Sequence, residues 1–150
     1  MFAGYWEQPD ESAKALAEGW FRTGDEGRLE ARGYLGISDR KKDVIISGGE
    51  NVSSVEVEDC LYQHPAVAEV AVIGVPSERW GETVKALVVR RPGQSADETE
   101  LIGFCRDRLA HFKCPTSIEF RDALARTATG KLQKFKLRSA YWEGYEKRVN

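Results

Sequence analysis

Lys131 stands at the end of a short run of small residues, Arg126-Thr127-Ala128-Thr129-Gly130-Lys131. Threonine, alanine and glycine make such a loop mobile, and a lysine on it can carry a compact positive charge to a phosphate or carboxylate. The run is not a phosphate-binding P-loop, because it lacks the first glycine and the Ser or Thr after the lysine. From these residues alone, an ordinary surface lysine is the competing interpretation.

The second feature with chemical potential is the glycine pair Gly48-Gly49, which follows the apolar stretch Val44-Ile45-Ile46. β-Branched residues in so short a run predict a buried strand. Paired glycines let the backbone approach a ligand closely, since no Cβ is in the way. The capping box Ser53-x-x-Glu56 then predicts that a helix starts at once. A plain structural corner is the competing interpretation of this strand, turn and helix.

Asp25 and the charged run Asp39-Arg40-Lys41-Lys42-Asp43 are the remaining polar candidates. Asp25 follows a glycine in the turn Thr23-Gly24-Asp25, where a carboxylate can accept two hydrogen bonds from a diol. An aspartate that merely forms the turn is the alternative. The charged run is equally compatible with plain solvated charge.

The elements that must hold these residues predict an α/β (α+β) domain, with a small three-stranded sheet flanked by helices. Residues 1–38 offer only a helix at Pro9–Glu18 and a β-hairpin at Leu29–Ile37, too little to bury a core. We therefore expect them to belong to a larger body. From residue 43 onward we expect strands at Val44–Ser47, Val67–Val75, Thr83–Arg90 and Ser117–Phe120. We expect helices at Ser54–His64, from Asp97 towards Pro115, and near Gln133–Lys147. The second of these helices would carry an apolar stripe made of Leu101, Phe104, Cys105, Leu109 and Phe112.

Composition indicates a globular protein, with 150 residues, 41% of them hydrophobic and 31% charged. No apolar run is long enough to span a membrane, and the first ten residues have no signal-peptide pattern. Three cysteines without metal-ligand spacing predict free buried thiols in a reducing cytosol. Residues 121–150 carry eight basic and three acidic residues, while residues 1–30 carry three and seven. A basic end suits phosphate-bearing ligands, although a solvated helix face would explain it too.

Four motifs, taken together and in order, resemble the C-terminal end of the acyl- and aryl-CoA synthetases, AMP-forming members of the adenylate-forming superfamily. They are Gly19-Trp20-Phe21-Arg22-Thr23-Gly24-Asp25, the stretch from Ser38 to Val52, Glu78-Arg79-Trp80-Gly81-Glu82, and Arg126 to Lys131. The resemblance implies that residues 1–38 are the tail end of an N-terminal adenylation domain, hairpin included. Residues 39–42 would be a hinge and residues 43–150 a mobile C-terminal domain.

For the nucleotide, the resemblance implies that Lys131 is the catalytic lysine, which neutralises charge where the substrate carboxylate attacks the α-phosphate of ATP. Asp25 would bind the ribose hydroxyls of ATP and AMP, and Arg40 would contact the nucleotide. Lys42 matches the hinge position. The family usually has proline before the Arg-Thr pair, and here that residue is Ala125.

For CoA, the resemblance implies that the pantetheine tunnel is lined by the run Gly48-Gly49-Glu50-Asn51. Trp80 matches a tryptophan that packs near CoA, and Phe112 matches an aromatic residue that some relatives place against the CoA adenine. Phe112 fits the apolar stripe of its predicted helix equally well. Cys114 stands where some relatives carry an arginine for the CoA phosphates, so these contacts are expected to differ here.

The implied reaction converts a carboxylic acid, ATP and CoA to acyl-CoA, AMP and pyrophosphate through an acyl-adenylate, with Mg²⁺ accompanying ATP. The glycine motif favours a fatty or aryl acid, in a cytoplasmic enzyme without nucleic-acid partners or a transmembrane segment. We expect the chain to need the missing N-terminal domain and to be inactive alone. Two alternatives stay open: adenylation for another acceptor, such as a carrier protein or, as in luciferase, oxygen; or a non-enzymatic binding module.

Overall fold

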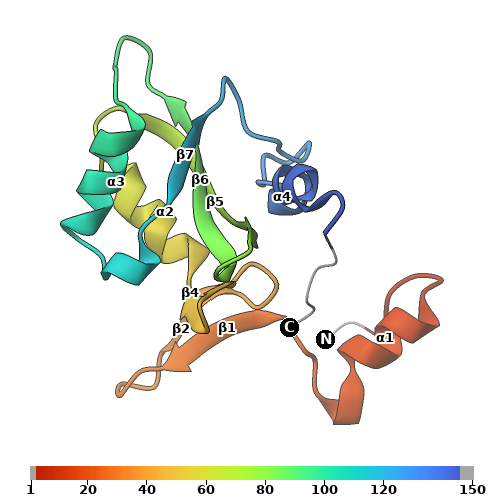
Figure 1. Ribbon diagram of the computed structural model, residues 1–150. Helices are drawn as coiled ribbons and strands as arrows, with labels where there is room; N and C mark the ends of the chain where they lie inside the picture. Colours follow the sequence, from red (N-terminus) through yellow and green to blue (C-terminus); the bar gives the residue numbers. More distant parts are fainter. Residues whose placement is uncertain (1–2, 146–150) are drawn as a thin grey trace.

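The structure is a computed structural model that describes residues 3–145. Its main body is a mixed sheet covered by helices on both faces, and a two-stranded hairpin and a short helix precede it (Figure 1). The α+β class predicted from the sequence is confirmed by this arrangement. None of the helices in residues 3–145 has the length and apolar character needed to cross a membrane.

The segment before residue 41 forms a helix and a hairpin. Helix α1 (Pro9–Ala15) ends earlier than predicted, because Leu16 leaves the helical conformation with φ −108° and ψ 34°. A 3-10 turn follows at Ala17–Gly19. Strands β1 (Asp25–Leu29) and β2 (Leu35–Arg40) pair antiparallel. The predicted hairpin at Leu29–Ile37 is therefore present, but its strands extend further on both sides.

The main sheet has five strands rather than the predicted three. The strand predicted at Val44–Ser47 is present as β3 (Ile45–Ser47), but its place in the sheet and its partner β4 (Glu50–Val52) were missed. Gly48 and Gly49 take positive φ values of 61° and 90°, which turn the chain straight back. Strand β6 lies in the centre, antiparallel to β5 and parallel to β7, and it meets β3 at one end. The strands are β3 (Ile45–Ser47), β4 (Glu50–Val52), β5 (Val67–Ser77), β6 (Gly81–Arg90) and β7 (Ser117–Phe120).

Helices α2 (Ser54–Tyr62) and α3 (Glu98–Arg106) cover one face of the sheet, and α4 (Lys134–Trp142) covers the other (Figure 1). Both predicted caps are confirmed: the Glu56 N–H donates to Ser53 Oγ at 3.3 Å, and the Glu100 N–H donates to Asp97 Oδ1 at 2.8 Å. The apolar stripe predicted to reach Phe112 is too long, since α3 ends at Arg106 and a 3-10 turn occupies His111–Lys113. The last helix, predicted near Gln133–Lys147, ends earlier, at Trp142, and residues 143–145 form a turn; residues 146 and 147 lie outside the described part.

The packing of the core explains why the sequence of β5 is a continuous apolar run. Val70 and Val72 pack on the side of α2 and α3, while Ala71 and Ile73 pack on the side of α4, so both faces of the strand are buried. The three cysteines are buried free thiols, as predicted. Burial raises the pKa of all three, and that of Cys105 to about 12.

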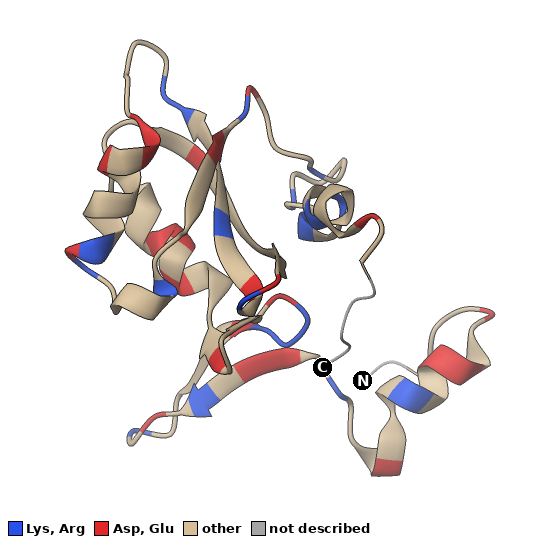
Figure 2. Ribbon diagram, in the orientation of Figure 1, with Lys and Arg blue, Asp and Glu red and all other residues tan. Residues whose placement is uncertain are grey.

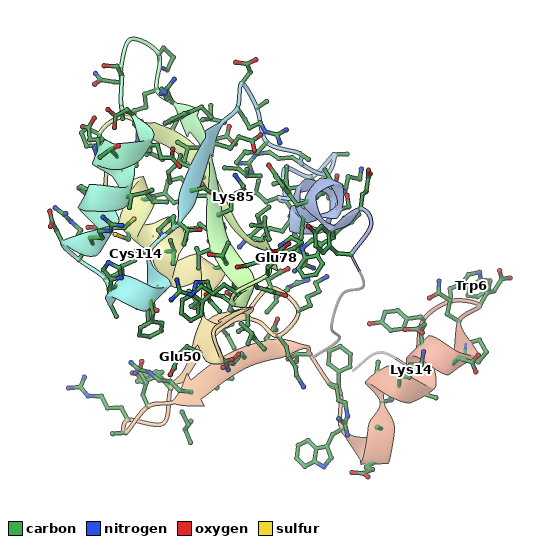
Figure 3. All side chains as sticks on the ribbon, viewed as in Figure 1. Trp6, Lys14, Glu50, Glu78, Lys85 and Cys114 are labelled. Carbon is green, nitrogen blue, oxygen red and sulfur yellow. The ribbon has the colours of Figure 1, made fainter. Side chains whose placement is uncertain are left out.

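The segment of residues 3–38 contributes nothing to this core, since none of its residues is buried. Large apolar side chains there face solvent, including Trp6 and Trp20, which are 87% and 78% exposed. Figure 3 shows Trp6 beside α1, away from the sheet.

Lys and Arg residues lie along α4, on the opposite face of the sheet from α2 and α3 (Figure 2).

Candidate functional site

A cleft of about 560 Å³ lies where the β1–β2 hairpin meets the first turns of α2 and α4. Its lining includes Asp25, Arg40, Lys42 and Lys131, the four residues assigned to the nucleotide and the hinge from the sequence. These residues span more than a hundred positions of the chain, and the fold brings them to one cavity. The cleft is open to solvent.

Within the cleft, Asp25 and Arg40 form a cross-strand pair. They are directly opposite one another in the register of β1 and β2, and Arg40 Nε lies 3.7 Å from Asp25 Oδ1. The Asp25 N–H donates a hydrogen bond to Thr23 Oγ1 at 3.1 Å. The carboxylate is thus presented at the strand end with a cation beside it, an arrangement that can bind a hydroxyl pair and an adjacent anion.

Lys131 reaches the cleft from a closed turn rather than from the flexible loop expected from its sequence. The Lys131 N–H donates to Thr127 Oγ1 at 3.1 Å, and the Thr127 N–H donates to Lys131 O at 2.8 Å. Arg126 anchors the turn by donating to Gly130 O at 2.7 Å and pairing with Glu69 at 2.6 Å. Among residues 3–145 the Lys131 ammonium has no ion-pair partner, so its charge is available to a ligand.

A second cavity, of about 650 Å³, shares no lining residue with the first. Gly48, Glu50, Trp80 and Phe112 line it, and Gly49 lines an adjoining cavity with Gly48 and Trp80. Trp80 and Phe112 are 46% and 47% exposed. Phe112 therefore lies outside the core, which removes the interpretation as part of a helical stripe.

The glycine turn is fitted to Trp80. The Gly48 N–H donates to Trp80 O at 3.0 Å, and a Cβ on Gly48 would meet Trp80 Cε3 at 2.9 Å. Asn51 is the exception among the predicted residues, because it lies exposed in β4 opposite Ile46 and lines neither cavity.

Sequence reasoning missed the two basic side chains of the second cavity, Arg106 and His111. Both are exposed, and neither side chain has a salt bridge within residues 3–145. The positive charge of Arg106 acts to lower the pKa of Cys114, the residue that stands where some relatives carry an arginine. The fold thus supplies a cation to this cavity from the end of α3.

Sequence reasoning also missed a buried polar network beside the first cleft. Lys134 Nζ pairs with Glu58 Oε1 at 2.7 Å and donates to Ser54 Oγ at 2.7 Å. The Val72 N–H donates to the same Glu58 oxygen at 2.7 Å. Burial raises the pKa of Glu58, although the charge and hydrogen bond of Lys134 act against that rise. No local sequence signal identifies this network, because Lys134 is eighty positions from Ser54 and Val72 is fourteen from Glu58.

Comparison with known proteins agrees with this geometry. The sequence profile described as "AMP-binding enzyme C-terminal domain" matches residues 56–131, which is half of the chain. The chain belongs to this family. The match ends on Lys131, so in this AMP-binding C-terminal domain the β1–β2 hairpin lies before the matched segment and α4 lies after it.

Curated relatives of this AMP-binding C-terminal domain are much longer proteins. The chain is 53% identical over 141 residues to a probable CoA ligase, CCL11, of Humulus lupulus, with 92% of this chain and 25% of that protein covered. It is 49% identical over 137 residues to a long-chain-fatty-acid–CoA ligase of Bacillus subtilis, with 91% and 24% covered. The chain therefore spans about a quarter of the length of these relatives.

Two solved structures of one protein, MatB from Rhodopseudomonas palustris, resemble this AMP-binding C-terminal domain to different degrees. Both are 41% identical to it, and each alignment covers 97% of this chain and 29% of MatB. The ATP-bound structure gives a TM-score of 0.88, and the apo structure gives 0.70. The arrangement described above is thus nearer to that of the ATP-bound structure.

Proposed function

We propose that this chain is the C-terminal part of an ATP-dependent acyl-CoA synthetase. In the first half-reaction a carboxylate oxygen attacks the α-phosphorus of ATP, giving an acyl-adenylate and pyrophosphate. In the second, the CoA thiol attacks the acyl carbon and AMP leaves. The observation that carries the proposal is the cleft that unites Asp25, Arg40 and Lys131, apart from the cavity of Trp80 and Phe112.

In the first half-reaction, Lys131 would bring its ammonium to the oxygens on which negative charge accumulates during the attack. Asp25 would accept hydrogen bonds from the ribose hydroxyls, and Arg40 would contact the nucleotide phosphate. Mg²⁺ would arrive with the phosphates of ATP, as a companion of that substrate.

In the second half-reaction, the other cavity would receive CoA. The glycine turn and Trp80 would border the pantetheine arm, Phe112 would stack on the adenine, and Arg106 would supply positive charge for a phosphate. The two cavities share no lining residue, so each would serve a different half-reaction. We therefore propose that residues 43–150 turn about Lys42 between the steps.

Residues 1–38 are proposed to be the end of the preceding adenylation domain, which would carry the acyl pocket. The absence of any buried residue in positions 3–38, and the exposure of Trp6 and Trp20, support this assignment. The substrate is proposed to be a fatty or aryl acid, in a cytoplasmic enzyme whose three buried thiols stay reduced. The chain alone should then release no AMP when given acid, ATP and CoA.

The test uses the longer protein that contains this chain, with Lys131→Ala compared with Lys136→Ala, an exposed lysine of α4. Pyrophosphate exchange measures the first half-reaction, and CoA capture of presynthesised acyl-adenylate measures the second. We expect Lys131→Ala to abolish the first and spare the second, while Lys136→Ala changes neither. Equal loss of both would refute the assignment of Lys131. Acyl transfer to a carrier protein, but not to CoA, would favour the other acceptor class.

A further inference from the structure

Asp39 is a buried carboxylate that reaches across the proposed hinge. It is 5% exposed at the end of β2, and its Oδ2 accepts the Ser54 N–H at 2.6 Å and the Ser54 hydroxyl at 2.8 Å. Its Oδ1 accepts the Arg40 N–H at 2.7 Å. The first N–H groups of a helix lack partners within the helix and carry partial positive charge, so a carboxylate binds them well. Asp39 therefore acts as a second cap of α2.

This cap differs in origin from an ordinary one. Ser53, the adjacent residue, already caps α2 by accepting the Glu56 N–H. Asp39 comes from fifteen positions before Ser54 and lies on the other side of Lys42. Any turn of residues 43–145 about Lys42 moves the start of α2 relative to β2. Such a turn must pull Ser54 away from the Asp39 carboxylate.

Helix α4 contacts the same region, where the end of β2 meets the start of α2. Arg138 donates to the backbone oxygen of Lys42 at 2.9 Å. One turn earlier on α4, Lys134 donates to the Ser54 hydroxyl that itself donates to Asp39. The end of β2, the hinge peptide and the starts of α2 and α4 are thus joined through direct hydrogen bonds.

We infer that Asp39 and Arg138 form a releasable latch that holds the hinge in the arrangement where Lys131 faces Asp25 and Arg40. The inference rests on the proposed function, and it adds positioning residues to that function. Neither residue needs to touch a substrate. Their role is to favour the adenylate-forming arrangement over the one that would serve CoA. The similarity of this arrangement to an ATP-bound relative supports the assignment.

The latch contact can be tested on this chain without any activity. Asp39→Asn keeps the shape of the side chain and removes its charge, and Glu26→Gln, at the position opposite Asp39 on β1, is the matched control. Hydrogen exchange measured by NMR should speed up about tenfold at the Ser54 amide in Asp39→Asn, because a charge-assisted hydrogen bond is weakened. The Glu100 amide, capped by Asp97 in α3, should not change. Unchanged exchange at Ser54 would overturn the latch.

The positioning role is tested in the longer protein by separating the half-reactions. Asp39→Asn and, independently, Arg138→Gln should each slow pyrophosphate exchange about tenfold and leave CoA capture of acyl-adenylate unchanged or faster. Glu26→Gln should alter neither rate. Equal loss of both half-reactions would show a purely structural role and overturn the positioning assignment. If the wild-type protein performed neither half-reaction, both the proposed function and the positioning role would be refuted. Hydrogen exchange at the Ser54 amide would still decide whether the contact between Asp39 and Ser54 exists.

Discussion

Replacing Lys134 with Met should cost about 3–5 kcal/mol of folding free energy at neutral pH, because it leaves a buried carboxylate without its cation. The side chains of Lys134 and Glu58 are only 14% and 11% exposed, and they lie 2.7 Å apart. In the variant the Val72 N–H would remain as the partner of Glu58. One neutral donor does not compensate a buried charge.

The magnitude follows from two opposed terms. At 2.7 Å the attraction between unit charges is about 6 kcal/mol for an effective dielectric constant of about 20. Removing each ion from water costs several kcal/mol, so the pair as a whole contributes little net stability. The double variant Glu58→Gln/Lys134→Met should therefore lie much nearer the wild type than Lys134→Met alone. Gln at position 58 still accepts the Val72 N–H.

The cost should also depend on pH in a defined direction. Burial raises the pKa of Glu58 above its ordinary value of 4.5, and the charge and hydrogen bond of Lys134 restrain that rise. Without Lys134 the pKa rises further. A carboxyl group with a raised folded-state pKa stabilises the fold fully below pH 4.5, and that contribution is lost as pH rises through the folded-state pKa. The penalty of Lys134→Met should thus shrink from pH 7.5 to pH 5.

The assay is urea unfolding followed by circular dichroism at both pH values, with Lys136→Met on the exposed side of α4 as the control. A double-mutant cycle with Glu58→Gln isolates the coupling between the two side chains. An equal penalty at both pH values would refute the role of the Glu58 charge. So would a double variant no more stable than Lys134→Met.

Three further predictions concern the second cavity and the thiols. Gly48→Ala should destabilise the chain by about 1–2 kcal/mol, because a residue with a Cβ would have to adopt a left-handed conformation and would meet Trp80. An unchanged unfolding midpoint would contradict this. In the longer protein, Arg106→Ala should raise the KM for CoA about three- to tenfold without slowing pyrophosphate exchange, and an unchanged KM would remove Arg106 from the site. At pH 8 only about one Cys105 thiol in ten thousand should be ionised, so alkylation measured by mass spectrometry should be far slower in the native than in the urea-unfolded chain, and equal rates would contradict its burial.

Features fixed by near neighbours in the sequence could be predicted. Ser53 and Asp97 start their helices by accepting an N–H three residues later, which is a local signal. Strands β5 and β6 are antiparallel neighbours, as their short connection and apolar runs indicate. The residues proposed for the nucleotide could be named because each belongs to a recognisable motif, and the fold brings them to one cleft.

Features fixed by distant partners could not be predicted. Asp39 appeared to be one member of a solvated charge cluster, and only the fold reveals that it caps a helix. Lys134 meets Ser54 across eighty positions, and no periodicity encodes such a contact. Asn51 was grouped with Gly48 and Gly49 as one ligand loop, but the sharp glycine turn puts it in a strand. Arg106 lay in a helix with no motif around it.

The distribution of buried polar groups gives a physical reason for a latch made of charge. Among residues 3–145 only Asp39, Ser54, Glu58 and His64 are buried polar or charged residues, and three of these four belong to the network around the hinge. Apolar contacts of similar area would hold β2 against α2 and α4 without the desolvation cost of buried charges. Opening such contacts, however, would expose apolar surface to water, which is unfavourable in proportion to its area. Charged groups regain hydration when their contacts open, so the closed and open arrangements can differ by little. The proposed hinge would turn in every catalytic cycle, and a polar junction would keep the free-energy difference between its two arrangements small.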